Sequence, residues 1–256
     1  MKQTDFIFGT LLDHEQKTGL RKIILSNNGS IFDEATLSTT ALLYFVSQMN
    51  IHCPGISVLT MESRPEYVDR AELEVIARAI AEGETASRLE VAIGFEAFDD
   101  TIRNEHFKKG LTLDAFEKLA SMLSDYDFML KTYFMLKPVP GITEEEAVAD
   151  IHAGMRYLDA IADRYNLDIN MHLNPTYVAA GTPLETAFRK GDYVPPLMES
   201  VRKAVLGAQG MRISVFAGLF DEGLAVPGGS FVRPGDEALT KRLEAFNRSG
   251  DFTLIG

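Results

Sequence analysis

A polar turn follows the first strand-like segment of this chain and could bind a charged ligand. The run that starts at Lys22, KIILSNNGS, loses its apolar character at Asn27, Asn28, Gly29 and Ser30. A turn of this composition presents backbone N–H donors at the end of a strand. It can hold a carboxylate or the head group of an amino acid, and the alternative is an ordinary loop between a strand and a helix.

Charged residues also end the next two strand-like segments. In Ile56–Val68 the apolar run stops at Glu62 and Arg64, and in Arg88–Gly110 it stops at Glu96. The carboxyl ends of parallel strands are where α/β folds bind ligands. Two carboxylates there could serve a hydrolase that uses acid/base or metal chemistry, whereas the alternative role of each is to anchor a loop.

Further polar residues continue the same pattern along the chain. Lys108 and Lys109 follow Glu96, Lys137 follows the apolar run FMLKTYFML, and Asn174 follows INMHL. Each has a structural alternative, because the two adjacent lysines suit a solvated helix end and an asparagine before proline suits a turn.

The elements that must position these residues alternate between strand and helix. Apolar runs predict strands over Lys22–Leu25, Ile56–Val68, Leu89–Phe95, Phe128–Gly141, Leu167–Val178 and Arg212–Phe220. Helical spacing predicts helices over Thr4–Lys17, Ser38–Met49, Arg70–Glu82, Leu113–Leu123 and Leu197–Gln209, with another that starts at a capping box of Thr143 and Glu146 and one that starts at Asp99 and Asp100.

This alternation favours a parallel sheet, because parallel neighbours need crossover connections. A doubly wound sheet would gather its polar residues at one switch point. Here they follow successive strands, which favours a partial or full barrel of the TIM type.

Composition bounds the class of protein. With 256 residues, 46% of them hydrophobic and 24% charged, the chain can form one large α/β domain. A net charge of −12 argues against a sequence-independent grip on nucleic acid. One cysteine, Cys53, excludes a disulfide framework or a cysteine metal cage within the chain. With no membrane-length apolar run and no leader-like start, we expect a soluble, cytoplasmic protein without a membrane partner.

Five blocks resemble, in order and spacing, the radical SAM superfamily: NNGSIFD, ESRPEYV, IGFEAFDDTIRNEHFKKG, YFMLKP and HLNPTYVAAGTPLETAFRKGDYVPP. They are most similar to the branch that includes the elongator catalytic subunit and the radical SAM protein of archaeosine tRNA modification. The likeness runs from about Lys22 to about Pro196. It implies a partial parallel (β/α) barrel that binds S-adenosylmethionine and a [4Fe-4S] cluster and forms a 5'-deoxyadenosyl radical, with tRNA modification as one candidate use of that radical.

The resemblance also implies roles for the residues at the strand ends. The turn Asn27–Ser30 matches the one that holds the methionine amino group, and Glu62 and Glu96 match polar positions that face the cofactor. Arg64 is the exposed partner of Glu62 in this pattern. Lys109, together with Lys108, falls near a basic residue that approaches the methionine carboxylate. The loop that contains Lys137 and the segment at Asn174 resemble the places where the adenine is held.

One departure from the superfamily concerns its CxxxCxxC cluster loop. Neither that loop nor the strand before it has a counterpart here, and Cys53 lies on the amino side of a strand. Three thiolates are needed to bind such a cluster, so we expect that this chain alone binds no metal or cluster and generates no radical. Either an N-terminal portion is absent from this product, or the protein no longer performs radical chemistry and is a binding or partner module. The substrate, tRNA or a small molecule, stays open.

Two expectations concern organisation. Residues 1–210 are expected to form the incomplete barrel and residues 211–256 a C-terminal extension packed on it. A barrel without its first strand would leave the backbone of Lys22–Leu25 exposed at a sheet edge. We therefore expect either a homodimer through that strand or an N-terminal helix, Thr4–Lys17, folded across it.

Overall fold

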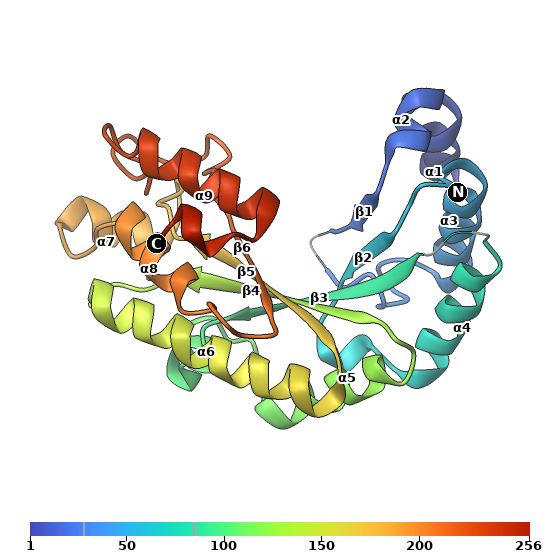
Figure 1. The fold of residues 1–256 in the computed structure, drawn as a ribbon, viewed down its shortest axis with the longest axis horizontal. Coiled ribbons are helices and arrows are strands. Elements are labelled where there is room, and N and C mark those ends of the chain that lie inside the picture. The colour runs from blue at the N-terminus through green and yellow to red at the C-terminus, as the bar shows by residue number, and fades with distance from the viewer. Residues whose placement is uncertain (28, 84, 86) are drawn as a thin grey trace. The chain divides into compact units, whose positions relative to one another are not determined.

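The computed structural model describes residues 1–27, 29–83, 85 and 87–256. Within these residues one sheet contains six strands in the order of the sequence (Figure 1). The strands are β1 (Lys22–Leu25), β2 (Val58–Glu62), β3 (Arg88–Glu96), β4 (Met129–Leu136), β5 (Asp168–Pro175) and β6 (Ser214–Ala217). Each was expected from an apolar run in the sequence.

Parallel pairing joins β1 to β2, β2 to β3 and β5 to β6. In the first two pairs Ile24 lies opposite Thr60, and Thr60 lies opposite Glu90. Sequential strand order with helical crossovers is the arrangement of a partial parallel (β/α) barrel of the TIM type. The predicted fold class is therefore confirmed.

The helices that cross between strands are α3 (Thr39–His52), α4 (Arg70–Ala81), α5 (Leu113–Ser124), α6 (Glu144–Tyr165), α7 (Pro183–Lys190) and α8 (Met198–Leu206), and α9 (Glu237–Ser249) follows β6. Side-chain oxygens cap several of them. Ser38, Asp69 and Thr112 each accept a hydrogen bond from the backbone N–H three residues later. At α6, Thr143 and Glu146 form the predicted capping box.

The N-terminal helix differs from the prediction. Instead of one helix over Thr4–Lys17, the chain forms α1 (Lys2–Phe6), a π-helical turn η1 (Ile7–Leu11) and α2 (His14–Gly19). Asp13 forms a capping box with Gln16 and starts a second helix, because its carboxylate accepts from the Gln16 N–H at 2.7 Å. The apolar spacing alone therefore overstated the helix length.

Three more helical segments departed from expectation. The segment after Asp99 and Asp100 is a π-helix, η3 (Thr101–His106), whereas α7 and α9 lie in stretches for which the sequence predicted no helix. Asp99 does serve as a cap, since its Oδ1 accepts from the Ile102 N–H at 2.9 Å. Short 3-10 turns, η2 (Pro65–Tyr67) and η4 (Phe252–Leu254), complete the elements.

The chain divides into two compact units. Unit 1 comprises residues 1–94, 112–131 and 165–168, and unit 2 comprises residues 95–111, 132–164 and 169–256. The core of unit 1 includes Val46, Met49, Leu59, Met61, Leu73 and Val91, and the core of unit 2 includes Phe95, Phe134, Leu136, Met155, Met171 and Val201. Each unit carries some of the predicted site residues, and each is described separately below.

Candidate functional site

The turn after β1 belongs to unit 1. Its Gly29 N–H donates to Oδ1 of Asn27 at 2.8 Å, which closes a tight polar turn. Ser30 is buried, whereas Asn27 is exposed. Asn28, also predicted as a site residue, lies outside the described residues.

This turn meets the end of β2. The Arg64 N–H donates to Oγ of Ser30 at 3.0 Å, and the Ile31 N–H donates to the carbonyl of Glu62 at 2.9 Å. The exposed Arg64 guanidinium pairs with Glu66 at 2.8 Å. The structure therefore brings together three predicted residues, Ser30, Glu62 and Arg64, through their backbone and one buried hydroxyl.

A buried polar group that the sequence analysis missed lies in the same unit. Glu90 of β3 accepts from Nζ of Lys22 at 2.6 Å and from Oγ1 of Thr60 at 2.7 Å. Lys131 of β4 is buried near them, and this burial, reinforced by the charge of Lys22, lowers the pKa of Lys131. The alternation of side chains along β2 could have indicated this polar group, because Thr60 is two residues from Glu62 and lies on the same face of the strand.

In unit 2, Glu96 ends β3 in the left-handed region, at φ 70°. Its carboxylate lies 2.6 Å from Nζ of Lys109, so two predicted residues form an ion pair. The side chain of Glu96 is 15% exposed and that of Lys109 is 33% exposed. Lys108, in contrast, is exposed and left-handed, at φ 52°, as expected for a loop position.

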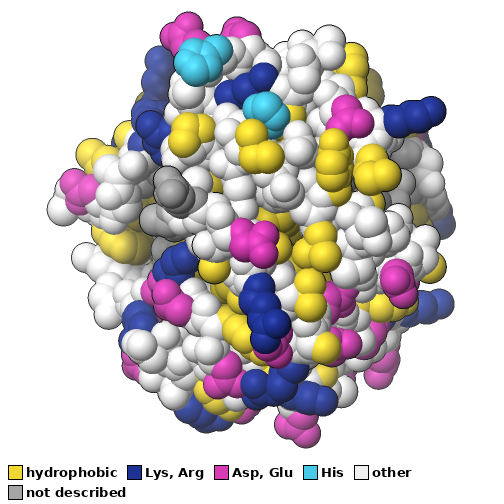
Figure 2. Space-filling view, turned by 90° about the vertical axis from the view of Figure 1, so that its right-hand side faces the viewer, with side chains coloured by type: hydrophobic (Ala, Val, Ile, Leu, Met, Phe, Trp, Pro, Cys, Tyr) yellow, Lys and Arg dark blue, Asp and Glu magenta, His cyan; other side chains and the backbone are white. Residues whose placement is uncertain are grey.

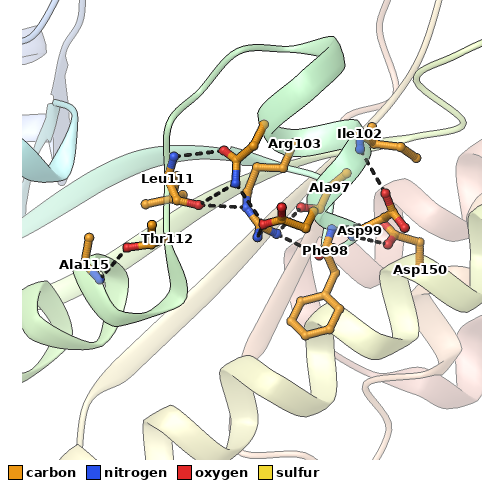
Figure 3. A network of polar contacts seen from close by, with 11 residues as sticks. Ala97, Phe98, Asp99, Ile102, Arg103, Leu111, Thr112, Ala115 and Asp150 are labelled. Carbon is orange, nitrogen blue, oxygen red and sulfur yellow. Dashed lines mark hydrogen bonds and ion pairs between the residues drawn. The ribbon is translucent and has the colours of Figure 1, made fainter.

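The loop between Glu96 and Lys109 is built around Arg103, which is 2% exposed. Its guanidinium donates to the carbonyls of Leu111, Ala97 and Phe98 at 3.0, 3.1 and 2.7 Å (Figure 3). It also pairs with Asp100 at 2.6 Å. One buried cation therefore satisfies the carbonyls on both sides of the loop.

Asp150 of α6 holds the start of this loop. Its two carboxylate oxygens accept from the N–H groups of Phe98 at 3.0 Å and Asp99 at 2.6 Å (Figure 3). Burial raises the pKa of Asp150, and these two hydrogen bonds oppose that effect. The loop conformation thus depends on a helical residue that is 52 and 51 positions away from its two partners in sequence.

Lys137, another predicted residue, directly follows β4 and lies in the left-handed region, at φ 57°. Its Nζ lies 2.6 Å from Oε1 of Glu144 at the start of α6, and its carbonyl accepts from the Tyr193 hydroxyl at 2.8 Å. Glu144 also accepts from the Leu197 N–H at 3.1 Å. Burial acts to raise the pKa of Glu144, but the hydrogen bonds that it accepts outweigh burial and lower that pKa, so the carboxylate stays charged.

A cavity of about 540 Å³ lies beside these loops in unit 2. Its lining is mainly apolar, and among the described residues that form it Asn174 is the one predicted site residue. The residues are His106, Phe107, Met135, Pro138, Val139, Pro140, Asn174, Pro175, Thr176, Tyr177, Ala179, Thr182, Pro183 and Leu184. An apolar cavity with a few polar groups at the carboxyl ends of parallel strands suits a flat organic ligand such as a purine.

The cavity walls are fixed by the two polar networks. His106 and Phe107 belong to the loop that Arg103 and Asp150 hold, and Pro138–Pro140 lie in the segment that the Lys137–Glu144 pair closes. Sequence reasoning anticipated the segments at Lys137 and Asn174 but not the contribution of Phe107 or α7.

Metal ligands are a separate question. Among the described residues no group of three or more His, Cys, Asp or Glu side chains could hold a metal ion. Cys53 is fully buried next to the end of α3, and this burial raises the pKa of its thiol. One buried thiol does not fit the ligand set of an iron–sulfur cluster.

Sequence comparison identifies relatives of this chain among known proteins. No family model matches the chain. An archaeosine synthase subunit beta of Methanosarcina acetivorans is 28% identical over 174 residues, which is 68% of this chain and 47% of that protein. The chain is similar to archaeosine synthase beta subunits. An uncharacterized protein of Methanocaldococcus jannaschii is 26% identical over 175 residues, 68% of this chain and 44% of that protein.

The fold has a solved counterpart as well. Archaeal Elp3 of Methanocaldococcus infernus, with an N-terminal deletion, superposes with a TM-score of 0.60 at 15% identity, over 90% of this chain and 54% of that one. Together with the archaeosine synthase relatives, this fold confirms the predicted relationship to the elongator and archaeosine branch of radical SAM proteins. The chain spans about half the length of the curated relatives that it matches.

We searched the helices in the described part of the chain for candidate membrane spans. None of its helices combines the length and the apolar character that a membrane span requires.

Proposed function

We propose that this chain is a radical SAM-type core that binds S-adenosylmethionine and acts in tRNA modification. The cavity of about 540 Å³ in unit 2 carries this proposal, because it combines apolar walls with Asn174 at the carboxyl ends of β4 and β5. The names of the archaeosine synthase relatives support the tRNA assignment.

The residues divide the cofactor between them in this proposal. Pro138, Val139 and Phe107 of the cavity lining would hold the adenine, and Asn174 would offer it a hydrogen bond. Lys109, which pairs with Glu96, would bind the methionine carboxylate, with Lys108 and Lys137 as supporting charges. For the polar residues of unit 1, Asn27, Gly29, Ser30, Glu62 and Arg64, a role in binding the methionine end stays an expectation from the resemblance alone.

Bound S-adenosylmethionine supplies a sulfonium whose reductive cleavage gives a carbon radical. Reduction needs a [4Fe-4S] cluster, and the donor set of this chain does not fit one, since its single thiol is buried. We propose that the polypeptide alone generates no radical. Anaerobic reconstitution with iron and sulfide should leave no stable charge-transfer absorption after desalting, and stoichiometric retained iron would contradict this.

A second candidate function is a noncatalytic binding module, with which the single buried thiol of Cys53 is equally consistent. It keeps the same cavity but performs no chemistry. Both candidate functions include ligand binding, so a binding assay does not distinguish them. The distinguishing test adds a source of cluster thiolates and a reductant: a radical SAM-type core should then form 5'-deoxyadenosine from S-adenosylmethionine, and a noncatalytic module should not.

The binding test uses S-adenosylhomocysteine in calorimetry, since it lacks the reactive sulfonium. We expect weak, saturable binding that Asn174→Ala weakens about 2- to 10-fold, the value of one neutral hydrogen bond. Asn170→Ala is the matched control, because Asn170 lies earlier on the same face of β5, bonds Ser214 and is outside the cavity lining. Absence of binding at millimolar ligand in a folded sample would overturn the proposal.

Partners and organisation are also proposed. Ile24 of β1 is 49% exposed, and β1 is an outer strand of the sheet. The N-terminal helical turns α1 and η1 contact α3. We therefore favour a homodimer through β1 over a helix that covers it. A cytoplasmic location and a C-terminal extension over residues 211–256, which begins with the last barrel strand β6, are further proposals. Ile24→Lys should convert the dimer to a monomer in light scattering, and a wild-type monomer would refute it.

A further inference from the structure

The strands of unit 2 carry different side chains on their two faces. One face of β4 and β5 packs against α6, where a Cβ on Gly154 would lie 2.7 Å from Phe134 and 3.5 Å from Met171. These positions are fully buried. The alternate positions in unit 2 are partly buried, so the second face is less completely covered than the first.

Three rings occupy neighbouring strands on this second face: Tyr133 of β4, His172 of β5 and Phe216 of β6. The centroids of Tyr133 and His172 are 5.3 Å apart, and those of His172 and Phe216 are 4.9 Å apart. Phe216 is 41% exposed. We call Tyr133, His172 and Phe216 the aromatic row.

The aromatic row is continuous with the cavity but distinct from it. Met135 and Asn174, which line the cavity, follow Tyr133 and His172 by two residues on the same face. Gly218 lies beside the junction, since a Cβ there would be 2.8 Å from Oδ1 of Asn174 and 3.5 Å from Nε2 of His172. A ligand on the row would therefore approach a ligand in the cavity.

The charge of the chain limits the class of ligand that the aromatic row can bind. Lys131, two residues before Tyr133 on the same face of β4, is buried and interacts with Glu90. With a net charge of −12 on the chain, phosphates gain little here. On a different face of the molecule, the side that lies on the right in Figure 1, Figure 2 shows basic and acidic side chains interspersed rather than gathered into one basic surface. An exposed ring backed by two partly buried rings on a sheet face instead suits stacking with an unpaired base.

We infer that the aromatic row stacks a single unpaired nucleobase, next to the cavity proposed for the cofactor. Phe216 supplies the exposed ring face, and His172 and Tyr133 hold that ring and extend the platform. The inference rests on the proposed function only in taking RNA as the source of the base.

The absence of tryptophan from this chain makes a direct test possible. Phe216→Trp places a single reporter in the row, and Phe252→Trp places one in the Phe246–Phe252 contact of the same unit as a matched control. Guanosine should quench the fluorescence of the Phe216→Trp variant saturably, more strongly than uridine, and ribose 5-phosphate should have no effect. Adding His172→Ala should weaken binding about 5- to 150-fold, the range that base–aromatic stacking spans.

Saturating S-adenosylhomocysteine distinguishes guanosine binding at the aromatic row from guanosine binding in the cavity. The guanosine signal should persist in its presence, whereas competition would assign guanosine to the cavity and overturn the inference. Equal quenching of the Phe252→Trp control, or no saturable response, would also overturn it. If Phe216→Trp fails to fold, saturation-transfer NMR of guanosine with wild type and Phe216→Leu replaces it, with loss of transfer expected for the variant and retained transfer contradicting the inference.

Failure of this inference is distinguishable from failure of the proposed function. S-adenosylhomocysteine binding without guanosine binding rejects the row alone. Guanosine binding without S-adenosylhomocysteine binding rejects the cofactor assignment alone.

Discussion

Nζ of Lys109 lies 2.6 Å from Oε1 of Glu96, so the loop after β3 returns to the residue at which that strand ends. The pair Lys137–Glu144 repeats this arrangement just after β4, also at 2.6 Å. Glu96 and Lys137 both have a positive φ, a conformation that costs about 1 to 3 kcal/mol without glycine. The ion pairs offset part of that cost.

Glu96→Gln should lower the free energy of unfolding by about 1 kcal/mol, because it removes a partly buried charge pair. The loss of stability should be smaller in about 1 M salt, because salt screens the attraction between the partly exposed charges of Glu96 and Lys109. Urea denaturation followed by circular dichroism measures it. Glu66→Gln is the control, because Arg64 and Glu66 are 57% and 52% exposed and should contribute almost nothing. Equal effects of the two substitutions would contradict the prediction.

Arg103→Lys should be far more damaging than its conservative chemistry indicates. An ammonium group cannot reproduce the planar guanidinium that reaches three carbonyls and Asp100. Each buried carbonyl left without a partner costs about 1 to 3 kcal/mol, so we expect a loss of about 3 kcal/mol or more. Arg78→Lys, in an exposed pair with Glu74, provides the comparison. A stability within about 1 kcal/mol of wild type for Arg103→Lys would show that the network has little weight.

Gly154→Ala tests the packing of α6 on the sheet. The added methyl group would lie 2.7 Å from the Phe134 ring, so we expect destabilisation of about 1 to 3 kcal/mol from overpacking. Gly9→Ala is the matched substitution, since a Cβ at Gly9 meets nothing within 4 Å. It should be neutral or stabilise by up to about 1 kcal/mol, because alanine loses less backbone entropy. Thermal melting distinguishes them, and a neutral Gly154→Ala would mean that the helix shifts freely.

Glu72 of α4 gives a pH prediction. Burial, together with the carboxylates of Asp69 and Glu34, raises the pKa of Glu72 to about 7 from 4.5. Between these values the unfolded chain has lost a proton that the folded chain keeps, so the free energy of unfolding falls as pH rises. Glu72→Gln removes this titration. The gain of the variant over wild type should therefore be larger at about pH 8 than at about pH 5 in urea titrations. A constant difference would count against the raised pKa.

Sequence patterns were sufficient for the parts of this protein that depend on local residues. Apolar runs located the strands, and the Thr143–Glu146 capping box was found from spacing alone. Parallel strand order also implies that Ser30 and Arg64 come together, as the structure shows. That they bind a cofactor stays a prediction.

Residues whose role depends on distant partners were not predictable. Arg103 stands in a charged stretch that looks solvated, yet carbonyls of Ala97 and Leu111 converge on it and bury it. Asp150 has no local sign of its role, because its partners Phe98 and Asp99 belong to another element. The break at Asp13 arose because a local cap competed with the helical pattern.

The segment from Lys137 to Glu144 has a consequence for ligand binding. Pro138 and Pro140 fix their own φ angles, and the ion pair ties the two ends of the segment together. A wall restrained in this way has few conformations to lose when a ligand enters the cavity. Association is then free of much of the ordering entropy that a flexible loop would impose, about 1 to 2 kcal/mol per residue, so affinity in this cavity depends chiefly on shape complementarity.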